Sequence, residues 1–413
     1  MKKKKILNIF TYDYPLIGND NIFIHDEVIF FSKKFKKVNI IPIKKGTNNI
    51  KDMNGNVNID YSLIDEIYNI KKLLMKISNI LCCKYLWLEI LNLKYKNYFR
   101  KIKMLLTERY LAESIYQSVS NKKNCKHELF YSFWSNHTLL AFYFLKKKNI
   151  IMNSFSRILG SDLKGFIPND DYIPFKKIKF LNLDFVLILN EEQKKILSSE
   201  RLINKKKIYK NYLGINLSSK LDLRKMFKKQ ISFASCGSLI HVKNTIEIIN
   251  FISVFSRIYS DHQITYFCIG VGNQKKNILK YAKNNLPKNV KFKYIEYVPS
   301  LVDFLKKHRV NYFMNFSLSE GMSFAVMEAL SCSIPVICSN IPGNTEIIKN
   351  THGYILKKLT SKEYVIISKN IINDIDKKKY LKKRKSSYLF TKKNLSRDIW
   401  TKKLDNIVNR LAH

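Results

Sequence analysis

Two carboxylates stand out in the stretch SLSEGMSFAVMEALSCSIPVICS, residues 317–339. Glu320 lies just before an apolar segment, and Glu328 lies inside it. VNYFMNFS before them is typical of a buried strand, SFAVMEALSC of a short helix, and IPVICS of the next strand. Because ligands bind beyond the carboxyl ends of parallel strands, we expect Glu320 in a ligand-binding loop and Glu328 in the second helical turn.

The start of this predicted helix offers an anion site. Ser323 is placed to cap the helix, and Gly321 lets the backbone approach a ligand closely. The backbone N–H groups expected to point at an anion are those of Met322, Ser323 and Phe324. Carboxylates accept hydrogen bonds from hydroxyls and do not bind phosphate. The order of these three groups along the sequence therefore predicts that a sugar lies at Glu320, a diphosphate at the helix start and a ribose at Glu328.

Strands that could position these residues recur along the whole chain. The apolar runs are KILNIFTY, VNIIPI, ELFYSF, IIMNSF and DFVLIL in the first half, and ISFASCG, ITYFCIG, VKFKYIEYV, VNYFMNF and IPVICS in the second. Most are continuously apolar, which is typical of parallel strands buried on both faces. Helical stretches separate them, so the sequence predicts an α/β fold of two doubly wound, Rossmann-like domains facing a cleft.

The predicted joint between the domains is KNYLGINLSSKLDLRKMFKKQ, residues 210–230, which is polar and basic. We expect an N-terminal domain over 1–210 and a C-terminal domain over 211–385. A basic closing helix, 386–413, is expected to pack back on the N-terminal domain.

Composition limits the classes of protein and partner. The chain has 413 residues, 46% of them hydrophobic, which argues against disorder. Its net charge of +42 favours anionic partners, although lysine enrichment by composition alone explains the charge equally well. Seven cysteines without a CxxC pair support neither a zinc site nor a disulfide framework, and favour a reducing, cytosolic compartment. Nucleic-acid-binding signatures are lacking, as is an uninterrupted apolar stretch long enough to span a membrane.

One long segment, residues 67–118, is both basic and apolar. Leu, Ile, Tyr and Trp87 alternate there with the lysines Lys71, Lys72, Lys76, Lys84, Lys94 and Lys96. This combination suits an anionic membrane interface. Amphipathic helices packed on the sheet are the alternative.

Several motifs resemble one family. EGMSFAVME, residues 320–328, resembles the E-x7-E signature of retaining glycosyltransferases of family 4, which have the GT-B fold. ASCGSLIHVKNTIEII (234–249) and IPGNTEII (341–348) are similar to neighbouring segments of that family, and YLGIN (212–216) to its interdomain link. SRILGSDL (156–163) resembles the R-x-H-G-x-D segment of related polysaccharide enzymes. The resemblance extends over nearly the full length.

The resemblance implies a role for each matching residue. Glu320 would lie against the donor sugar, Glu328 would bind the ribose hydroxyls, and Lys243 would contact the donor diphosphate. A cation aimed at developing negative charge in a dry site stabilises a transition state, which suits Lys243 for the leaving group. The remaining expected donor-binding residues are Gly237, Gly321, Met322, Ser323 and Phe324.

Two positions depart from the family pattern. Ser238 stands where many relatives have a second phosphate-binding cation, and Leu159 stands where they have a histidine. His137 either substitutes for that histidine or simply begins a helix. Arg157 and Asp162 either line the site or form a structural pair. The loop after the first strand, with Asn19, resembles an acceptor-side loop.

The resemblance therefore implies a retaining hexosyltransferase of bacterial surface-polysaccharide synthesis, such as lipopolysaccharide or capsule. Its donor would be a nucleotide sugar and its acceptor a glycan or a polyprenyl-linked glycan. We expect a cytoplasmic protein, free or peripheral on the inner membrane face, with no cofactor, no nucleic-acid partner and no metal, since Asp170-Asp171 is a poor metal site. A non-catalytic sugar-nucleotide binder and a sugar-nucleotide epimerase of the same fold are the alternatives.

Overall fold

The computed structural model describes residues 4–15, 21–44, 53, 55–122, 125–160, 162–163, 170–217, 220–224, 229–376 and 378–409. The chain divides into two compact units, Met1–Asn211 with Ile407–His413, and Tyr212–Asn406. The first unit thus ends one residue later than the predicted domain. Of the predicted closing helix, only the part from Ile407 groups with the first unit.

In the described part of the first unit, seven parallel strands form one sheet, in the order β3-β2-β1-β4-β5-β6-β7. They are β1 (Lys4–Thr11), β2 (Phe35–Pro42), β3 (Val57–Ile59), β4 (Leu129–Ser132), β5 (Asn153–Arg157), β6 (Phe185–Ile188) and β7 (Ile208–Lys210). The central strands are buried on both faces, which is why their sequences are continuously apolar.

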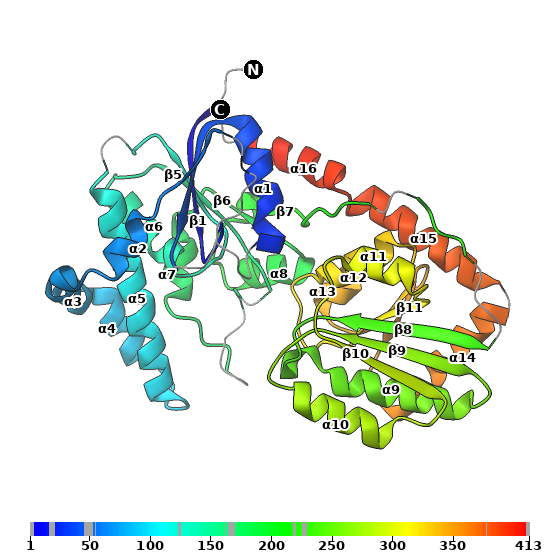
Figure 1. The fold of residues 1–413 in the computed structure, drawn as a ribbon. Helices are drawn as coiled ribbons and strands as arrows, with labels where there is room; N and C mark the ends of the chain where they lie inside the picture. Colours follow the sequence, from blue (N-terminus) through cyan, green and yellow to red (C-terminus); the bar gives the residue numbers. More distant parts are fainter. Residues whose placement is uncertain are drawn as a thin grey trace. The chain divides into compact units, whose positions relative to one another are not determined.

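A stack of helices covers one side of this sheet, with the long helix α5 at its centre (Figure 1). α5 packs against α2, α3, α4 and α6. The helices are α1 (Asn21–Lys34), α2 (Ser62–Ile67), α3 (Leu73–Leu81), α4 (Lys84–Leu91), α5 (Tyr98–Ser120), α6 (His137–Lys147), α7 (Lys176–Leu181) and α8 (Glu191–Ser199), with short 3₁₀ turns η1 (Ile70–Lys72) and η2 (Lys205–Lys207). Apolar side chains of α2 to α7 and of the sheet form one continuous core.

The second unit contains a parallel sheet in the order β10-β9-β8-β11-β12-β13. Its strands are β8 (Gln230–Cys236), β9 (Gln263–Ile269), β10 (Val290–Ile295), β11 (Tyr312–Asn315), β12 (Val336–Ser339) and β13 (Gly353–Leu356). Strand order reverses between β8 and β11, which are neighbours. The carboxyl ends of two such strands border the crevice where ligands bind in open α/β sheets.

Helices cover both faces of this second sheet. α9 packs with α10 and α14, and α12 packs with α11 and α15; Figure 1 shows α9 and α10 on the opposite face from α11 and α12. The elements are η3 (His241–Lys243), α9 (Thr245–Ile258), α10 (Lys275–Asn285), α11 (Leu301–Lys307), α12 (Phe324–Ser331), α13 (Pro342–Ile347), α14 (Ser361–Asp376), α15 (Lys379–Asn394) and α16 (Arg397–Asn409).

The predicted α/β architecture is confirmed, and each strand segment named from the sequence contains a strand. Three short strands, β3, β7 and β13, were not predicted. Each is the edge strand of its sheet and has a neighbouring strand on one side only. The apolar signal of such a short edge strand is weak.

Candidate active site

The loop after β11 holds Glu320 in a network of hydrogen bonds. The Nζ atom of Lys243 lies 2.5 Å from Oε1 of Glu320. The Ser317 hydroxyl donates to the same oxygen at 2.8 Å, and Nδ2 of Asn315 lies 3.5 Å from it. The Glu320 side chain is only 10% exposed, so its charge is partly desolvated and has a fixed cation beside it.

Sheet topology brings Lys243 to Glu320. β8 pairs with β11, so the segments that follow their carboxyl ends are neighbours. The N–H of Leu318 donates to the carbonyl of Val242 at 2.8 Å and ties the two loops together. Lys243 remains 30% exposed, so a ligand can reach its ammonium group.

Two glycines allow backbone segments to meet at this end of the sheet. A Cβ at Gly270, whose φ is +136°, would lie 2.0 Å from the carbonyl oxygen of Gly237. A Cβ at Gly343 would lie 2.4 Å from the carbonyl oxygen of Glu320. The start of α13 therefore packs directly on the Glu320–Gly321 backbone, and a larger residue at Gly343 would push the two apart. A larger residue at Gly270 would likewise push the Gly237 backbone away.

Glu328, in the second turn of α12, has a different environment. Burial raises the pKa of its carboxyl group to about 7. Its carboxylate makes no hydrogen bond or ion pair with any residue that the structure describes. Burial and then the charge of Glu328 raise the pKa of the Cys236 thiol to about 12, which places this carboxylate near the end of β8. An unpartnered, half-buried carboxylate at a ligand-binding edge calls for a hydrogen-bond donor from outside the chain.

The start of α12 lies as predicted. The helix begins at Phe324, and the Ser323 hydroxyl caps it by accepting from the N–H of Val326 at 3.4 Å. Met322 and Ser323 are each 7% exposed. Ser238, beyond Gly237, is exposed and supplies no cation.

One part of this network was not predicted from the sequence. Nδ2 of Asn344 lies 3.2 Å from Oδ1 of Asn315 and 3.1 Å from the carbonyl oxygen of Ser339. Asn315 in turn contacts Glu320 and Ser323. These buried amides hold the loop in place. Asn315 is a polar residue at the end of VNYFMN, an otherwise largely apolar strand, and that contrast is the sequence signal that could have identified it.

In the first unit, Arg157 lies inside the protein. Its side chain is fully buried and forms an ion pair with Glu27, while its guanidinium donates to the carbonyl and the side chain of Asn211 at 2.7 and 2.8 Å. Arg157 is therefore not paired with Asp162, which corrects that alternative. It also cannot reach a ligand without leaving its ion pair.

Asp162 instead holds the loop through its backbone. Its carboxylate accepts from the N–H of Leu159 at 2.8 Å and from that of Ser135 at 3.2 Å. Burial raises its pKa to about 6 despite these two bonds. The side chain of Leu159 is 5% exposed, and its carbonyl accepts from Gln193.

His137 is the first residue of α6, which Asn136 caps. Its Nδ1 lies 3.7 Å from Glu108, and its buried Nε2 has no hydrogen-bond partner among the described residues. Burial would raise the pKa of Glu108, but Lys179 and His137 together lower it to about 2. His137 thus begins a helix and also belongs to a charged cluster.

This cluster borders a pocket of about 460 Å³ in the first unit. Asp162, Glu108 and Lys179 line it together with Asn136 and Ser135 near the end of β4. Further lining residues come from α5, and sequence reasoning missed them: Arg100, Lys103, Met104 and Thr107. Asn19 lies outside the described residues.

An apolar surface covers the outer side of α3, α4 and the start of α5. Among its side chains, Leu74 and Leu91 are each 81% exposed, Tyr95 is 95% exposed and Phe99 is 88% exposed. We call this set the α3–α5 apolar surface: Leu73, Leu74, Met75, Ile77, Leu81, Trp87, Leu88, Leu91, Tyr95, Phe99 and Leu106.

Exposed basic residues alternate with these apolar ones along the same segment of the chain. They are Lys71, Lys84, Lys94, Lys96, Arg100 and Lys103. Lys76, expected among them, is buried and pairs with Glu66, because it lies on the inward side of α3. No helix in the described ranges is long and apolar enough to cross a membrane.

Metal-binding clusters of three or more His, Cys, Asp or Glu are absent from the described residues. Asp170 pairs with the buried Lys101 at 2.8 Å. That ion pair gives Asp170 a structural role.

Residues 223–387 match the family described as "Glycosyl transferases group 1". This range contains the Lys243–Glu320 pair and Glu328, and it covers most of the second unit. The match supports a glycosyltransferase with the GT-B fold.

Curated relatives match shorter parts of the chain. The "Capsular polysaccharide biosynthesis glycosyltransferase CapH" of Staphylococcus aureus is 30% identical over 186 residues, which are 40% of this chain and 49% of CapH. The chain spans half or less of the length of the curated relatives it matches.

Solved structures match over nearly the full length. The lipopolysaccharide outer core galactosyltransferase WaaB superposes with a TM-score of 0.69 at 14% identity, covering 98% of this chain and 99% of WaaB. HepE of Anabaena, in complex with UDP and glucose, has a TM-score of 0.64 at 10% identity, covering 98% of this chain and 99% of HepE. At these identities the likeness establishes the fold, two Rossmann-like units as in GT-B glycosyltransferases.

Proposed function

We propose that this protein is a retaining glycosyltransferase of family 4 that transfers a hexose from a nucleotide sugar to a lipid-linked glycan. The reaction would serve the synthesis of a bacterial surface polysaccharide. The observation that carries the proposal is the pairing of Lys243 with Glu320 at the carboxyl ends of β8 and β11, with the unpartnered Glu328 nearby.

Each of these groups matches one part of a nucleotide sugar. Glu328 has no hydrogen-bond donor among the described residues and would accept hydrogen bonds from the two ribose hydroxyls. The start of α12 and the ammonium group of Lys243 would face the diphosphate. Glu320, fixed by Ser317 and Asn315, would accept from hydroxyls of the sugar and stabilise positive charge at its anomeric carbon.

The proposed step keeps the anomeric configuration. The bond between the anomeric carbon and the diphosphate oxygen breaks, and the acceptor hydroxyl forms its new bond on the same face. The acceptor proton passes to the departing phosphate oxygen, so no protein base is needed. Lys243 offsets the negative charge that develops on the leaving diphosphate.

The acceptor would bind in the first unit, in the pocket beside α5. Arg100 and Lys103 line it and suit a phosphate-bearing acceptor, Lys179 is paired there with Glu108, and Met104 and Ile173 offer apolar contact. Phe99 and Leu106, on the same stretch of α5, belong to the α3–α5 apolar surface. One helix would thus contact both the acceptor headgroup and a membrane, which favours a polyprenyl-linked acceptor.

We further propose that the α3–α5 apolar surface docks on an anionic membrane, on its cytoplasmic face. Exposed Leu, Trp, Tyr and Phe side chains that alternate with basic residues are typical of interfacial binding. Each lysine or arginine near an anionic surface adds about 1 kcal/mol of attraction.

Release of nucleoside diphosphate from a panel of nucleotide sugars tests the proposal, with and without bacterial membrane extract as acceptor source. We expect release from one donor, loss of at least about a hundredfold in Glu320→Gln, and unchanged release in Asp261→Asn. Asp261 is an exposed acid at the opposite end of the same sheet. Equal release by wild type and Glu320→Gln would refute the assignment of this site.

A further inference from the structure

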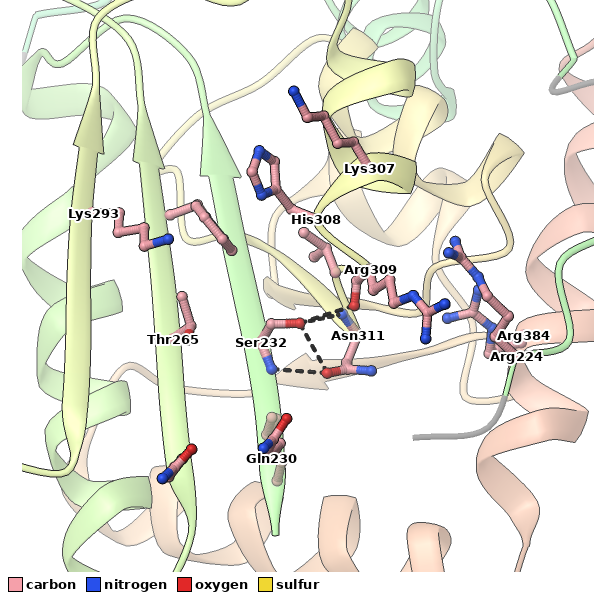
Figure 2. A pocket seen from close by; sticks show the side chains of 14 residues that line it. Arg224, Gln230, Ser232, Thr265, Lys293, Lys307, His308, Arg309, Asn311 and Arg384 are labelled. Atoms are coloured by element: carbon pink, nitrogen blue, oxygen red, sulfur yellow. Dashed lines mark hydrogen bonds between the residues drawn. The ribbon is translucent and has the colours of Figure 1, made fainter. Parts of the chain in front are cut away.

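The second unit contains another pocket, which begins at the amino ends of its strands and extends to Phe267 and Lys293 within β9 and β10 (Figure 2). Its volume is about 370 Å³. Gln230 and Gln263, the first residues of β8 and β9, line it, whereas Lys243 and Glu320 follow the carboxyl ends of β8 and β11. The pocket is therefore separate from the candidate donor site and independent of the proposed function.

Cationic side chains dominate the lining of this pocket. They are Arg224, Lys293, Lys307, Arg309 and Arg384, with His308 beside them. None of the described residues that line the pocket is acidic. A concave site with several positive groups and no lining carboxylate concentrates a positive potential.

One end of the pocket is built around a pair of arginines. Asp222 binds both, with Oδ2 lying 2.5 Å from Arg224 and 2.8 Å from Arg384. Arg384 is only 3% exposed and is held further by the hydroxyl of Tyr380 at 2.9 Å. One carboxylate thus fixes two guanidinium groups, and within the described residues it offsets only one of their two positive charges. Figure 2 shows Arg309 extending toward this pair.

The other end carries Lys293, Lys307 and His308. Neither lysine forms an ion pair with a described residue. The His308 ring packs against Phe304 and Phe267, with centroids 4.3 and 5.0 Å apart. Burial, and then the charges of Lys293 and Lys307, lower the pKa of His308. The two pocket lysines thus add to burial in disfavouring the charged imidazole.

The positive charge of the chain as a whole does not explain this arrangement. Lysine enrichment by composition places charges on exposed, convex surfaces, where they are solvated. Here a nearly buried arginine is oriented by two partners, and the floor is fixed by Asn311, whose Oδ1 accepts from the N–H and hydroxyl of Ser232 at 2.8 and 2.9 Å. Ordered guanidinium groups in a hollow match the oxygens of an oxyanion.

We propose that this pocket binds a small phosphate-bearing anion with at least two negative charges. The guanidinium groups of Arg224, Arg309 and Arg384 would donate to phosphate oxygens, and the lysines would act as point charges. The recognised chemistry is the phosphate group, whether it belongs to a free diphosphate or phosphate ester or to a lipid headgroup.

Binding of such an anion has a consequence for His308. The charged groups that act on its ring are Lys293 from β10 and Lys307 from α11, while Phe267 of β9 and Phe304 of α11 pack against the ring without charge. A bound anion would counter these charges and raise the imidazole pKa toward or above its ordinary value. Anion binding would therefore be accompanied by proton uptake near neutral pH.

The test follows the histidine resonances of the full-length protein by NMR during titration with sodium pyrophosphate at constant ionic strength. The His308 resonance is identified by its loss in His308→Gln. We expect a saturable shift of His308, a rise in its pKa, and Kd values raised about tenfold or more in Lys307→Gln and in Arg309→Gln. Both variants change exposed side chains, so folding is preserved and is checked by thermal unfolding.

Lys280→Gln is the matched control, because Lys280 is exposed on α10 and lies on the other face of the sheet. Its Kd is expected to stay within twofold of wild type. The His241 resonance, two residues from Lys243, separates binding at the candidate donor site from binding here. Dihexanoyl phosphatidate binding tighter than pyrophosphate would support the site and assign it to a lipid headgroup.

Two results would overturn the proposal. One is an equal shift of His308 when sodium chloride replaces pyrophosphate at the same ionic strength, since that response is screening alone. The other is an unchanged Kd in both Lys307→Gln and Arg309→Gln, since the anion would then bind elsewhere.

Discussion

Replacing Glu328 with glutamine should stabilise the ligand-free protein at alkaline pH while weakening nucleotide binding. Burial raises the pKa of this carboxyl group from 4.5 to about 7. Because the folded-state pKa is raised, the carboxyl group's stabilising contribution is fully present below the unfolded pKa and is lost as the pH rises through 7. At about 1.4 kcal/mol per pKa unit, ionising the buried group costs about 3 kcal/mol above neutral pH.

The magnitude can be tested by its pH dependence. Between about pH 5.5 and about pH 8.5 the wild type should lose about 2 kcal/mol through Glu328, and Glu328→Gln should not. For a unit of this size, that difference corresponds to about 4–8 °C in the midpoint of thermal unfolding. Scanning calorimetry of both proteins at the two pH values measures it, because all other titrating groups are shared.

The same variant provides a second readout. Nucleoside diphosphate affinity should fall by about tenfold or more, because an amide replaces an acceptor for two ribose hydroxyls. The reasoning would be refuted if Glu328→Gln destabilised the protein equally at both pH values. That result would mean that the native fold itself supplies a partner for the carboxylate.

Three further substitutions are informative. Lys243→Met should lower kcat about a hundredfold or more, measured with the active donor, and a change below about threefold would remove the assigned role in leaving-group stabilisation. Arg157→Met should destabilise the first unit by about 3–5 kcal/mol in denaturant unfolding, because Glu27 is left as an unpaired buried charge. Combining it with Glu27→Leu should recover part of that loss, and loss of activity at wild-type stability would instead indicate a ligand contact. Leu74→Glu and Leu91→Glu, each made singly, should weaken flotation with phosphatidylglycerol vesicles, whereas Leu389→Glu, the same change on α15 in the second unit, should float like wild type. Equal flotation of all three variants would contradict docking through the α3–α5 apolar surface.

The central strands and the helix after Glu320 could be predicted because their signals are local. A strand buried on both faces is continuously apolar, as in FVLI of β6 and VICS of β12, and Ser323 before an apolar segment is a capping pattern. β13, GYIL, contains a glycine and pairs at the sheet edge, so its sequence carries less of that signal.

Long-range pairing limited the prediction of the site. Lys243 and Glu320 meet because β8 and β11 are neighbours, a relation that sheet topology determines and local pattern does not. Arg157 occupies a motif position, yet its ion pair with Glu27, which lies in α1, buries it. Lys76 was expected on the surface because lysine usually is, but it pairs with Glu66 on the inward side of α3. The roles of Asp162 and His137 in binding remain predictions.

The most direct test of the account is proton NMR of one reaction, with the protein, its active nucleotide sugar and membrane extract in a single tube. The account predicts that the donor's anomeric signal disappears, that nucleoside diphosphate accumulates, and that the new glycosidic signal has the donor's anomeric configuration. A product of inverted configuration would contradict the retaining mechanism. Conversion of the donor into another nucleotide sugar without release of nucleoside diphosphate, or binding without any change, would contradict glycosyl transfer.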